Sequence, residues 1–235
     1  MLKRTSSIPA TFFFLAMMSV QAAAPRSPAT KLVTVSRADL CVTEGAVDEL
    51  PGGRLSVVVP KMRAYVNAFT PPEVDVQFTY LGSTGNEARL GSGELRRQFG
   101  LKLRAQDACN LVYAMWRIEP ESKLVVSVKS NAGQHTSTEC GNRGYRNIKP
   151  RRSTPVPGLR SGDTHDLHAE MKGDELKVFA DNTLVWEGSV GGDALSFDGP
   201  VGMRSDNARL EVQLRAPQLP ARPGRAPGCR KGEPE

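Results

Sequence analysis

The chain has few of the residue types from which catalytic and metal centres are usually built. It contains three histidines and four cysteines in 235 residues, and no two cysteines form a Cys-x-x-Cys pair. His165 and His168 would point to opposite sides of a strand, so they do not form a zinc site together. A glycine-rich phosphate loop, a nucleophile elbow and a Ser/His/Asp order are also missing. We therefore expect no metal among the site residues and no nucleophilic catalysis.

Strong amphipathic-helix patterns and dense basic stripes are absent as well. Lysine and arginine number 31 against 25 acidic residues, a net charge of +6, and these charges are scattered along the chain. Without a basic stripe that aromatic residues interrupt, nucleic acid is not an expected partner. A modest positive charge still attracts polyanions, so an acidic polymer is a candidate.

The first residues have the layout of a secretory signal peptide. Lys3 and Arg4 precede an apolar stretch over residues 12–20, and alanines follow at 22–24. This order predicts a signal peptide over residues 1–23, with cleavage near Ala22 to Ala24. The stretch is shorter than the roughly 20 apolar residues of a membrane span, and no later segment is long and apolar enough. We expect a secreted or periplasmic protein; an uncleaved anchor is the alternative.

Four cysteines remain after cleavage, and an even number in an exported chain predicts two disulfides. Three pairings are open. We favour Cys109–Cys140, which would join a strand to the loop that returns past it. Cys41–Cys229 would then connect the two ends of the domain. Free buried thiols are the alternative.

Composition divides the rest of the chain into three parts. Residues 24–36 are rich in Pro, Ser, Thr and Arg and indicate a flexible leader. Residues 217–235 form a proline-rich tail that cannot bury enough apolar surface to fold, so we expect disorder there. Residues 37–216 are of a length that one hydrophobic core can serve, and we expect one domain and a monomer.

Short alternating segments dominate this central part. Val74, Val76 and Phe78 share one side of a strand, whereas residues 110–118 are apolar on both faces, as in a central strand. Residues 176–180 and 184–186 flank a tight turn at Asp181. Many short strands between turn residues predict an all-β, two-sheet antiparallel sandwich.

Two stretches carry a family resemblance. Residues 166–188, DLHAEMKGDELKVFADNTLVWEG, and residues 199–205, GPVGMRS, resemble the closing strands of concanavalin A-like lectin/glucanase domains, including laminin-G-like domains. Gly199 and Gly202 would let the chain turn and pack closely at a sheet edge. The resemblance implies a jelly roll, a fold that hosts lectins, hydrolases, lyases and adhesive modules.

Glu73, Asp75 and Gln77 would lie on one side of a strand. This stretch resembles the catalytic strand of glucanase-type hydrolases, where carboxylates alternate on one face. Retaining hydrolysis needs two carboxyl groups about 5 Å apart. The resemblance implies an acid/base residue at Gln77, whose amide cannot deliver a proton. We therefore expect no catalytic residue and keep all three as candidate ligand contacts.

The central strand offers a second candidate site. On its less apolar face, Tyr113 could stack on a sugar ring and Arg117 could pair with a carboxylate or sulfate. His135 lies on a following loop within reach of this face. Lyases of the fold use Tyr and His as base and acid, so lyase chemistry is an alternative. A second alternative places Tyr113 in the core.

No cofactor is expected. Loop oxygens could hold a structural Ca²⁺, since hard cations prefer several oxygen ligands, and the candidates are Asp193, Asp198, Asp206 and Asn207. The leading hypothesis is an exported, non-catalytic module that binds a glycan or an envelope polymer, with an acidic polysaccharide as one option. A polysaccharide lyase or glycoside hydrolase is the first alternative. A structural or interaction domain without a sugar ligand is the second.

Overall fold

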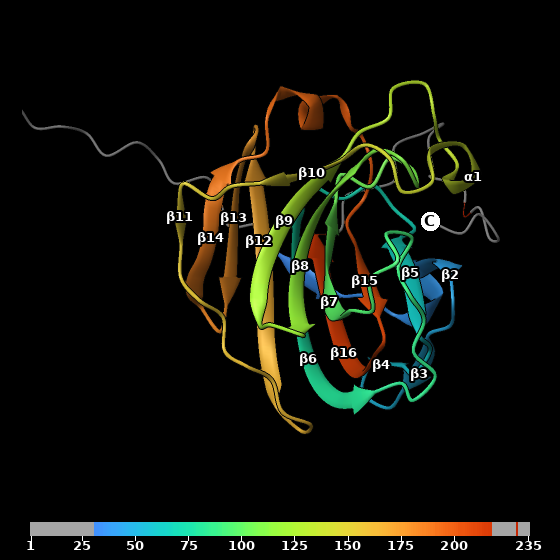
Figure 1. Ribbon diagram of the computed structural model, residues 1–235. Coiled ribbons are helices and arrows are strands. Elements are labelled where there is room, and N and C mark those ends of the chain that lie inside the picture. The colour runs from blue at the N-terminus through green and yellow to red at the C-terminus, as the bar shows by residue number, and fades with distance from the viewer. Residues whose placement is uncertain (1–30, 218–228, 230–235) are drawn as a thin grey trace, which may run out of the picture.

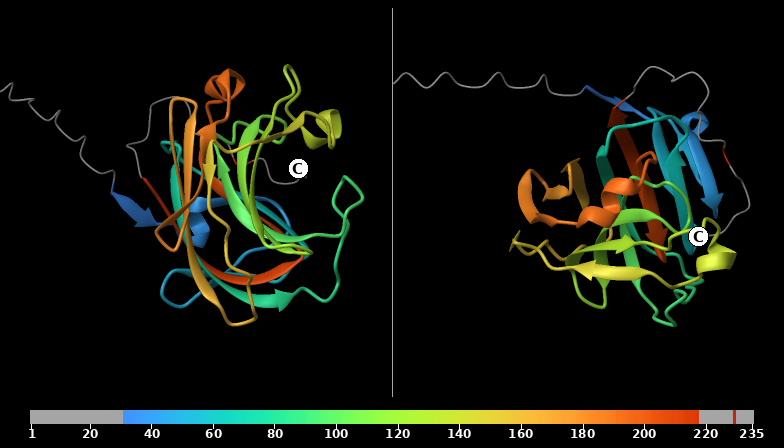
Figure 2. Two further views of the ribbon diagram at one scale, coloured as in Figure 1. Left: turned by 60° about the vertical axis from the view of Figure 1, so that its left-hand side comes forward. Right: turned by 90° about the horizontal axis from the view of Figure 1, so that it is seen from above.

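The computed structural model describes residues 31–217 and Cys229. Two antiparallel sheets pack face to face (Figure 1), and Figure 2 shows the curved layers from two further sides. This arrangement confirms the predicted all-β sandwich. No helix in the described ranges has the length and apolar character needed to cross a bilayer.

The first sheet has the strand order β11-β14-β13-β12-β6-β16-β4-β3, and β1 pairs with β16. Its strands are β1 (Leu32–Thr34), β3 (Asp48–Leu50), β4 (Arg54–Val57), β6 (Glu73–Ser83), β11 (Arg152–Ser153), β12 (Thr164–Lys172), β13 (Glu175–Ala180), β14 (Thr183–Ser189) and β16 (Ala208–Pro217).

The second sheet has the strand order β10-β9-β8-β7-β15-β5-β2. Its strands are β2 (Leu40–Glu44), β5 (Lys61–Val66), β7 (Arg97–Leu103), β8 (Leu111–Glu119), β9 (Lys123–Lys129), β10 (Tyr145–Ile148) and β15 (Gly202–Asp206). Short helices occur in the connections: α1 (Ser137–Cys140), and 3-10 turns at Arg37–Asp39 and Gly192–Ser196.

The core lies between the sheets and is built from alternate residues of each strand. Trp116 on β8 meets Phe78 on β6 edge to face, with ring centroids 5.6 Å apart, and Phe99 on β7 lies 5.1 Å from Phe78. All three side chains are buried. Aromatic pairs in this geometry stabilise a core beyond the area they bury. Since Trp116 points inward, Tyr113, Met115 and Arg117 project from the outer face of the second sheet.

Two glycines let neighbouring strands approach closely. A Cβ on Gly202 would lie 2.2 Å from the carbonyl oxygen of Ala64, and one on Gly199 would lie 2.1 Å from the carbonyl carbon of Ala105. The predicted close packing is therefore present. However, β15 lies between β7 and β5, so Gly202 is inside the sheet and not at an edge.

Both predicted disulfides form. Cys41 on β2 bonds to Cys229, and Cys109 bonds to Cys140 at the end of α1. Two disulfides are typical of proteins that fold in an oxidising compartment. The signal peptide predicted for residues 1–23 lies outside the described residues, as does most of the predicted tail.

The sandwich begins earlier in the chain than predicted. Residues 24–36 were expected to form a flexible leader, yet Leu32–Thr34 form β1, which pairs with the end of β16 from Arg215 to Pro217. The run of Leu, Val and Thr at this point suits a strand, and it satisfies backbone groups of β16 that would otherwise be unpaired.

We predict that removing the Cys109–Cys140 bond destabilises the fold. The two residues are 31 apart, and closing a loop of that size restricts the unfolded chain by about 3–4 kcal/mol. A Cys109→Ser/Cys140→Ser variant should therefore melt about 10 °C lower than the wild type in calorimetry. An unchanged melting temperature, with free thiol titration showing that the wild-type bond is formed, would contradict this expectation.

Candidate functional site

The outer face of the second sheet is rich in basic side chains. Alternation along β5, β7, β8, β9 and β15 places these residues on one face, and the strand registers bring them near one another. Tyr145 on β10 continues the same face beside β9. The basic residues are Lys61, Arg63, Lys102, Arg117, Lys123, Lys129 and Arg204.

One buried carboxylate holds the middle of this face together. Arg63 on β5 and Arg204 on β15 are directly opposite each other, where like charges destabilise a sheet. Asp206 accepts a hydrogen bond of 2.6 Å from Nη2 of Arg63 and one of 2.9 Å from Nε of Arg204. Gln98 on β7 donates to the same carboxylate at 2.7 Å. Three neighbouring strands are therefore connected through Asp206.

The ionisation of this group follows from its neighbours. Burial alone would raise the pKa of Asp206, but the guanidinium groups of Arg63 and Arg204 hold it well below its usual range. Burial alone would lower the pKa of Arg204, and the Asp206 carboxylate raises it above the ordinary value. Both groups therefore stay charged at neutral pH.

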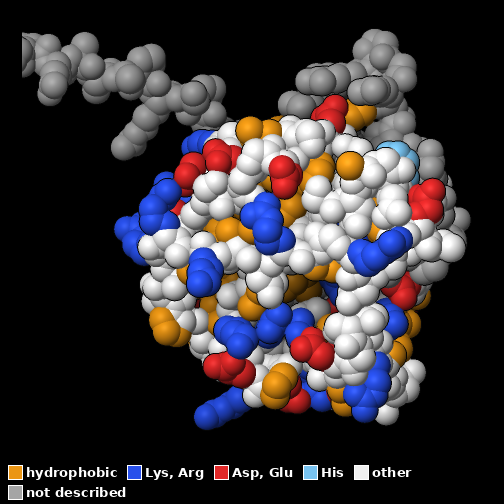
Figure 3. Space-filling model, turned by 45° about the horizontal axis from the view of Figure 1, so that its top comes forward, with side chains coloured by type: hydrophobic (Ala, Val, Ile, Leu, Met, Phe, Trp, Pro, Cys, Tyr) orange, Lys and Arg blue, Asp and Glu red, His pale blue; other side chains and the backbone are white. Residues whose placement is uncertain are grey.

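A cleft of about 330 Å³ opens on this face beside Asp206. The space-filling view shows a hollow bordered by lysine and arginine side chains (Figure 3). Strands β7 to β10 and β15 form its floor, and residues 90–96 and Asn142 form its walls. The side chains most relevant to binding are Arg96, Gln98, Tyr113, Arg117, Asn142, Tyr145, Asn147 and Arg204.

Tyr113 supports the floor of the cleft but is not available to a ligand. Its side chain is 1% exposed, because Tyr145 stacks on it at 6.1 Å and the Arg204 guanidinium lies 5.1 Å from its ring centroid. The prediction that Tyr113 stacks on a sugar is therefore wrong. Tyr145, which is 38% exposed, presents the aromatic surface instead. The sequence offered little sign of it, since residues 145–148 form a short and mostly polar strand.

Arg117 lines the cleft, as its position on the central strand predicted. Its buried Nε has no hydrogen-bond partner among the described residues. Burial lowers the pKa of Arg117, and the positive charge of Arg96 lowers it further, while Glu94 acts in the opposite direction. A desolvated guanidinium beside a second guanidinium favours an anion from outside the protein.

Glu73, Asp75 and Gln77 lie elsewhere. They share one face of β6, as predicted, but β6 belongs to the first sheet and this face is on the opposite side of the sandwich from the cleft. Asp75 accepts a hydrogen bond of 2.8 Å from Nε of Arg215, and Nη2 of the same guanidinium forms an ion pair with it at 2.6 Å. The structure therefore does not bring these three residues together with Arg117 in one site.

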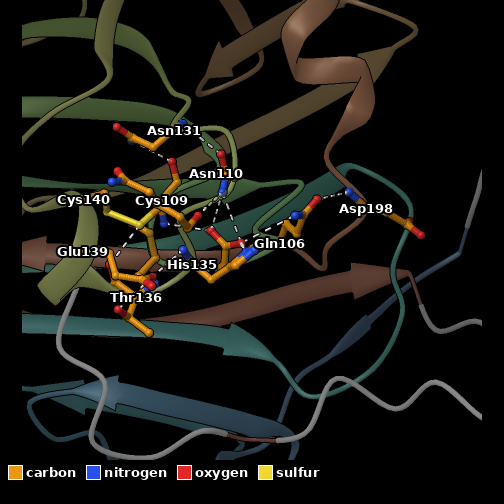
Figure 4. A network of polar contacts seen from close by, with 12 residues as sticks. Gln106, Cys109, Asn110, Asn131, His135, Thr136, Glu139, Cys140 and Asp198 are labelled. Carbon is orange, nitrogen blue, oxygen red and sulfur yellow. Dashed lines mark hydrogen bonds and ion pairs between the residues drawn. A yellow bond between two sulfur atoms is a disulfide. The ribbon is translucent and has the colours of Figure 1, made fainter.

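His135 is also separate from the cleft. Figure 4 shows it in a network of polar contacts beside the Cys109–Cys140 disulfide, where its Nδ1 lies 2.8 Å from a carboxylate oxygen of Asp107. Glu139 accepts hydrogen bonds from the backbone N–H groups of His135 and Thr136, which lower the pKa of Glu139 to about 2. These contacts hold the loop in place and keep His135 out of the cleft lining.

Two candidate calcium ligands are occupied by protein groups. Asp206 binds the two arginines, and the Asn207 side chain binds the backbone of Ala88 and the carbonyl of Arg96. Asn207 thereby positions the wall at residues 84–96. Within residues 31–217 and Cys229, no three His, Cys, Asp or Glu side chains are grouped so as to hold a metal.

Comparison with known proteins identifies the fold. No family model matches the sequence, and no curated protein matches it. The carbohydrate-binding module CBM66 from Bacillus subtilis has a TM-score of 0.51 at 15% identity, over 74% of this chain and 92% of that chain. A putative glycosyl hydrolase from Parabacteroides distasonis scores 0.48 at 9% identity, over 79% and 90% of the chains. LamAcat from Zobellia galactanivorans scores 0.44 at 14%, over 72% and 79%.

The similarity to CBM66 is a similarity of fold. This chain has the concanavalin A-like jelly-roll fold that residues 166–188 and 199–205 indicated, so that prediction is confirmed. Since one fold hosts many functions, the site has to be interpreted from its own residues.

We predict that Asp206→Asn destabilises the protein by about 3–5 kcal/mol at pH 7, because it leaves two buried guanidinium groups facing each other. The folded-state pKa of Asp206 is depressed, so its contribution is complete above the unfolded-state value of about 4 and is lost as pH falls through the lower folded value. The free energy of unfolding can be measured in urea between pH 7 and pH 2. Between these pH values it should fall less in the Asp206→Asn variant than in the wild type.

Asp48→Asn, which changes an exposed carboxylate on β3, is the matched control and should leave stability unchanged. Equal stability of wild type and Asp206→Asn at pH 7 would contradict the structural importance of Asp206.

Proposed function

We propose that this protein is an exported, non-catalytic module that binds an acidic polysaccharide in the cleft. The observation that carries the proposal is the lining, in which Arg96, Arg117 and Arg204 border the same cleft as the partly exposed ring of Tyr145. Arginine binds carboxylate and sulfate groups through paired N–H donors, and a tyrosine ring packs against the apolar face of a sugar.

The other polar side chains of the cleft suit the same ligand. Gln98, Asn142 and Asn147 line it together with Ser127. Amide and hydroxyl groups both donate and accept hydrogen bonds, as the hydroxyl groups of a sugar require. A cleft that combines such groups with guanidinium groups is suited to a sugar that also carries negative charge.

The fold supports a carbohydrate ligand. CBM66 is a carbohydrate-binding module by its title, and it is similar to this chain over most of its own length. Export is supported by the two disulfides, which suit the periplasm or the extracellular medium. The signal peptide at residues 1–23 and a monomeric state are part of the proposal.

The arrangement of carboxylates supports binding without hydrolysis. Two carboxyl groups about 5–10 Å apart are needed to cleave a glycoside, and among the described residues Glu94 is the one acidic residue that lines the cleft. Glu94 is paired with Arg96. Lyase chemistry with His135 is not favoured either, because His135 contacts Asp107 outside the cleft.

We predict that the protein binds alginate and glucuronan and does not bind a neutral β-glucan, with affinity that falls as salt rises. Arg117→Ala should weaken binding of the acidic polymers about tenfold, the cost of losing a hydrogen bond to a charged group. Isothermal titration calorimetry measures both effects. Arg54→Ala, which removes an exposed cation on the first sheet, is the control and should bind normally.

Two results would overturn the proposal. One is the absence of binding to every acidic polysaccharide of the panel and of a glycan array. The other is turnover of alginate, glucuronan or β-glucan, detected as unsaturated-product absorbance or as new reducing ends, which would make the protein an enzyme.

We also predict that Tyr145 contributes through its ring. Tyr145→Ala should reduce affinity for the acidic polymer up to about tenfold, whereas Tyr145→Phe keeps the ring and should bind almost as well as the wild type. The hydroxyl accepts a 3.3 Å hydrogen bond from Arg204, and this contact is lost in both variants. Equal losses in the two variants would assign the effect to Arg204 and not to stacking.

A further inference from the structure

A second cavity of about 290 Å³ adjoins the cleft. Leu90, Gly91, Asn142, Tyr145 and Arg204 line both spaces, so they share a border. The second cavity extends from this border over β5 and β9 toward α1. Its volume is close to the lower end of the roughly 300–1,000 Å³ of small-ligand pockets.

The lining of the second cavity is cationic without an acidic residue. Lys61 and Arg63 come from β5, Lys129 from β9 and Arg204 from β15. Ser137 and Asn142 add a hydroxyl and an amide. The cations come from three strands and approach the space from different sides, which suits an oxyanion with several oxygens better than a neutral ligand.

Two of these cations are buried and held in place. Arg63 is 3% exposed, and its Nη1 donates to the carbonyl groups of Met62 and Ser205. Lys129 is 1% exposed, and its Nζ donates to the carbonyl of Ala108 at 2.8 Å and lies 5.2 Å from the Tyr145 ring. Both cations therefore add fixed positive charge beneath the cavity, and the more exposed Lys61 and Arg204 are left to contact a ligand.

Arg63 is also paired outside the cavity. Its buried Nε lies 3.8 Å from Oε2 of Glu44 on β2, and neither atom has a hydrogen-bond partner among the described residues. The ion pair helps to hold the Arg63 side chain in place.

The loop at residues 84–96 borders the second cavity through Leu90 and Gly91. In the left view of Figure 2 this green loop rises beside the outer face of the second sheet. Asn207 holds its two ends through Ala88 and Arg96. At the tip, a Cβ on Gly91 would lie 3.4 Å from Cβ of Asn142, so the loop meets the segment after α1. This contact borders both cavities and limits the access of solvent.

We infer that the second cavity is an anion subsite, which receives the carboxylate or sulfate of a sugar residue adjacent to the one in the cleft. The inference rests on the proposed function, because the polymer would reach the subsite past Tyr145. It assigns to the polymer at least two negative groups on neighbouring residues, one at Arg117 and one at Lys61 and Arg204, the two cations of the second cavity that are not fully buried.

Residues that line the second cavity and not the cleft provide the test. Ser137 begins α1, where an acidic residue is tolerated by the helix, so Ser137→Asp places a negative charge in the cavity without disturbing the fold. Ser137→Asn has nearly the same size without the charge and is the matched control. Lys61→Gln removes a cation that is partly exposed at the rim. Thermal melts check that all three variants fold.

Titration of the full-length protein with alginate and with a sulfated polysaccharide is the first measurement. Ser137→Asp and Lys61→Gln should each bind the preferred polymer about tenfold more weakly than the wild type, and Ser137→Asn should bind equally well. Tighter binding of alginate would identify a carboxylate as the group that is bound, and tighter binding of the sulfated polysaccharide would identify a sulfate. Wild-type affinity in both Ser137→Asp and Lys61→Gln, together with a loss in Arg117→Ala, would overturn the subsite and leave the proposed function intact.

Inorganic sulfate is the second probe, compared with chloride at equal ionic strength. Sulfate stabilises proteins in general, and this effect should be the same in the wild type and in both Ser137 variants. Binding in the subsite should add a further rise in melting temperature for the wild type and Ser137→Asn that is smaller for Ser137→Asp. If no polymer binds but this difference is present, the proposed function fails and an anion site remains. If no polymer binds and the difference is absent, both fail.

Discussion

Asp206 is the residue on which the organisation of the basic face depends. Strand pairing places Arg63 and Arg204 opposite each other, and the sheet tolerates this because a buried carboxylate lies between them. The next residue, Asn207, holds the loop at residues 84–96 through backbone groups of Ala88 and Arg96. Two consecutive side chains thus neutralise part of the positive charge on the floor of the cleft and position the loop that forms its wall. The cleft and the second cavity therefore both depend on Asp206 and Asn207.

The two outer faces of the sandwich differ in how their charges are arranged. On the first sheet, opposite charges pair with each other, as in Asp75 with Arg215 and Arg151 with Glu175. Such exposed pairs are satisfied by one another or by water and contribute little to stability. On the second sheet, cations gather around two open clefts that hold few carboxylates among the described residues. This difference favours a site on the second sheet, although the resemblance to glucanase-type hydrolases points to β6 on the first.

Local alternation was sufficient to predict the strands and the two faces of β8, because side chains on a strand alternate with a period of two. The resemblance of residues 166–188 to concanavalin A-like domains then predicted that these strands form a jelly roll. The site depended on long-range pairing, which alternation does not reveal: β15 joins β5 to β7 across more than half of the chain. Only that pairing shows that Arg204 covers Tyr113, and that Asp206 lies between two arginines.

The selectivity for charged ligands that we propose would follow from burial more than from net charge. The net charge of +6 is small for 235 residues and would attract many polyanions equally. In the cleft, by contrast, a neutral sugar would cover the partly buried guanidinium of Arg117 without accepting a strong hydrogen bond from it. Leaving such a donor unpaired costs more than the bond itself contributes, so a site of this kind rejects ligands that lack the anion.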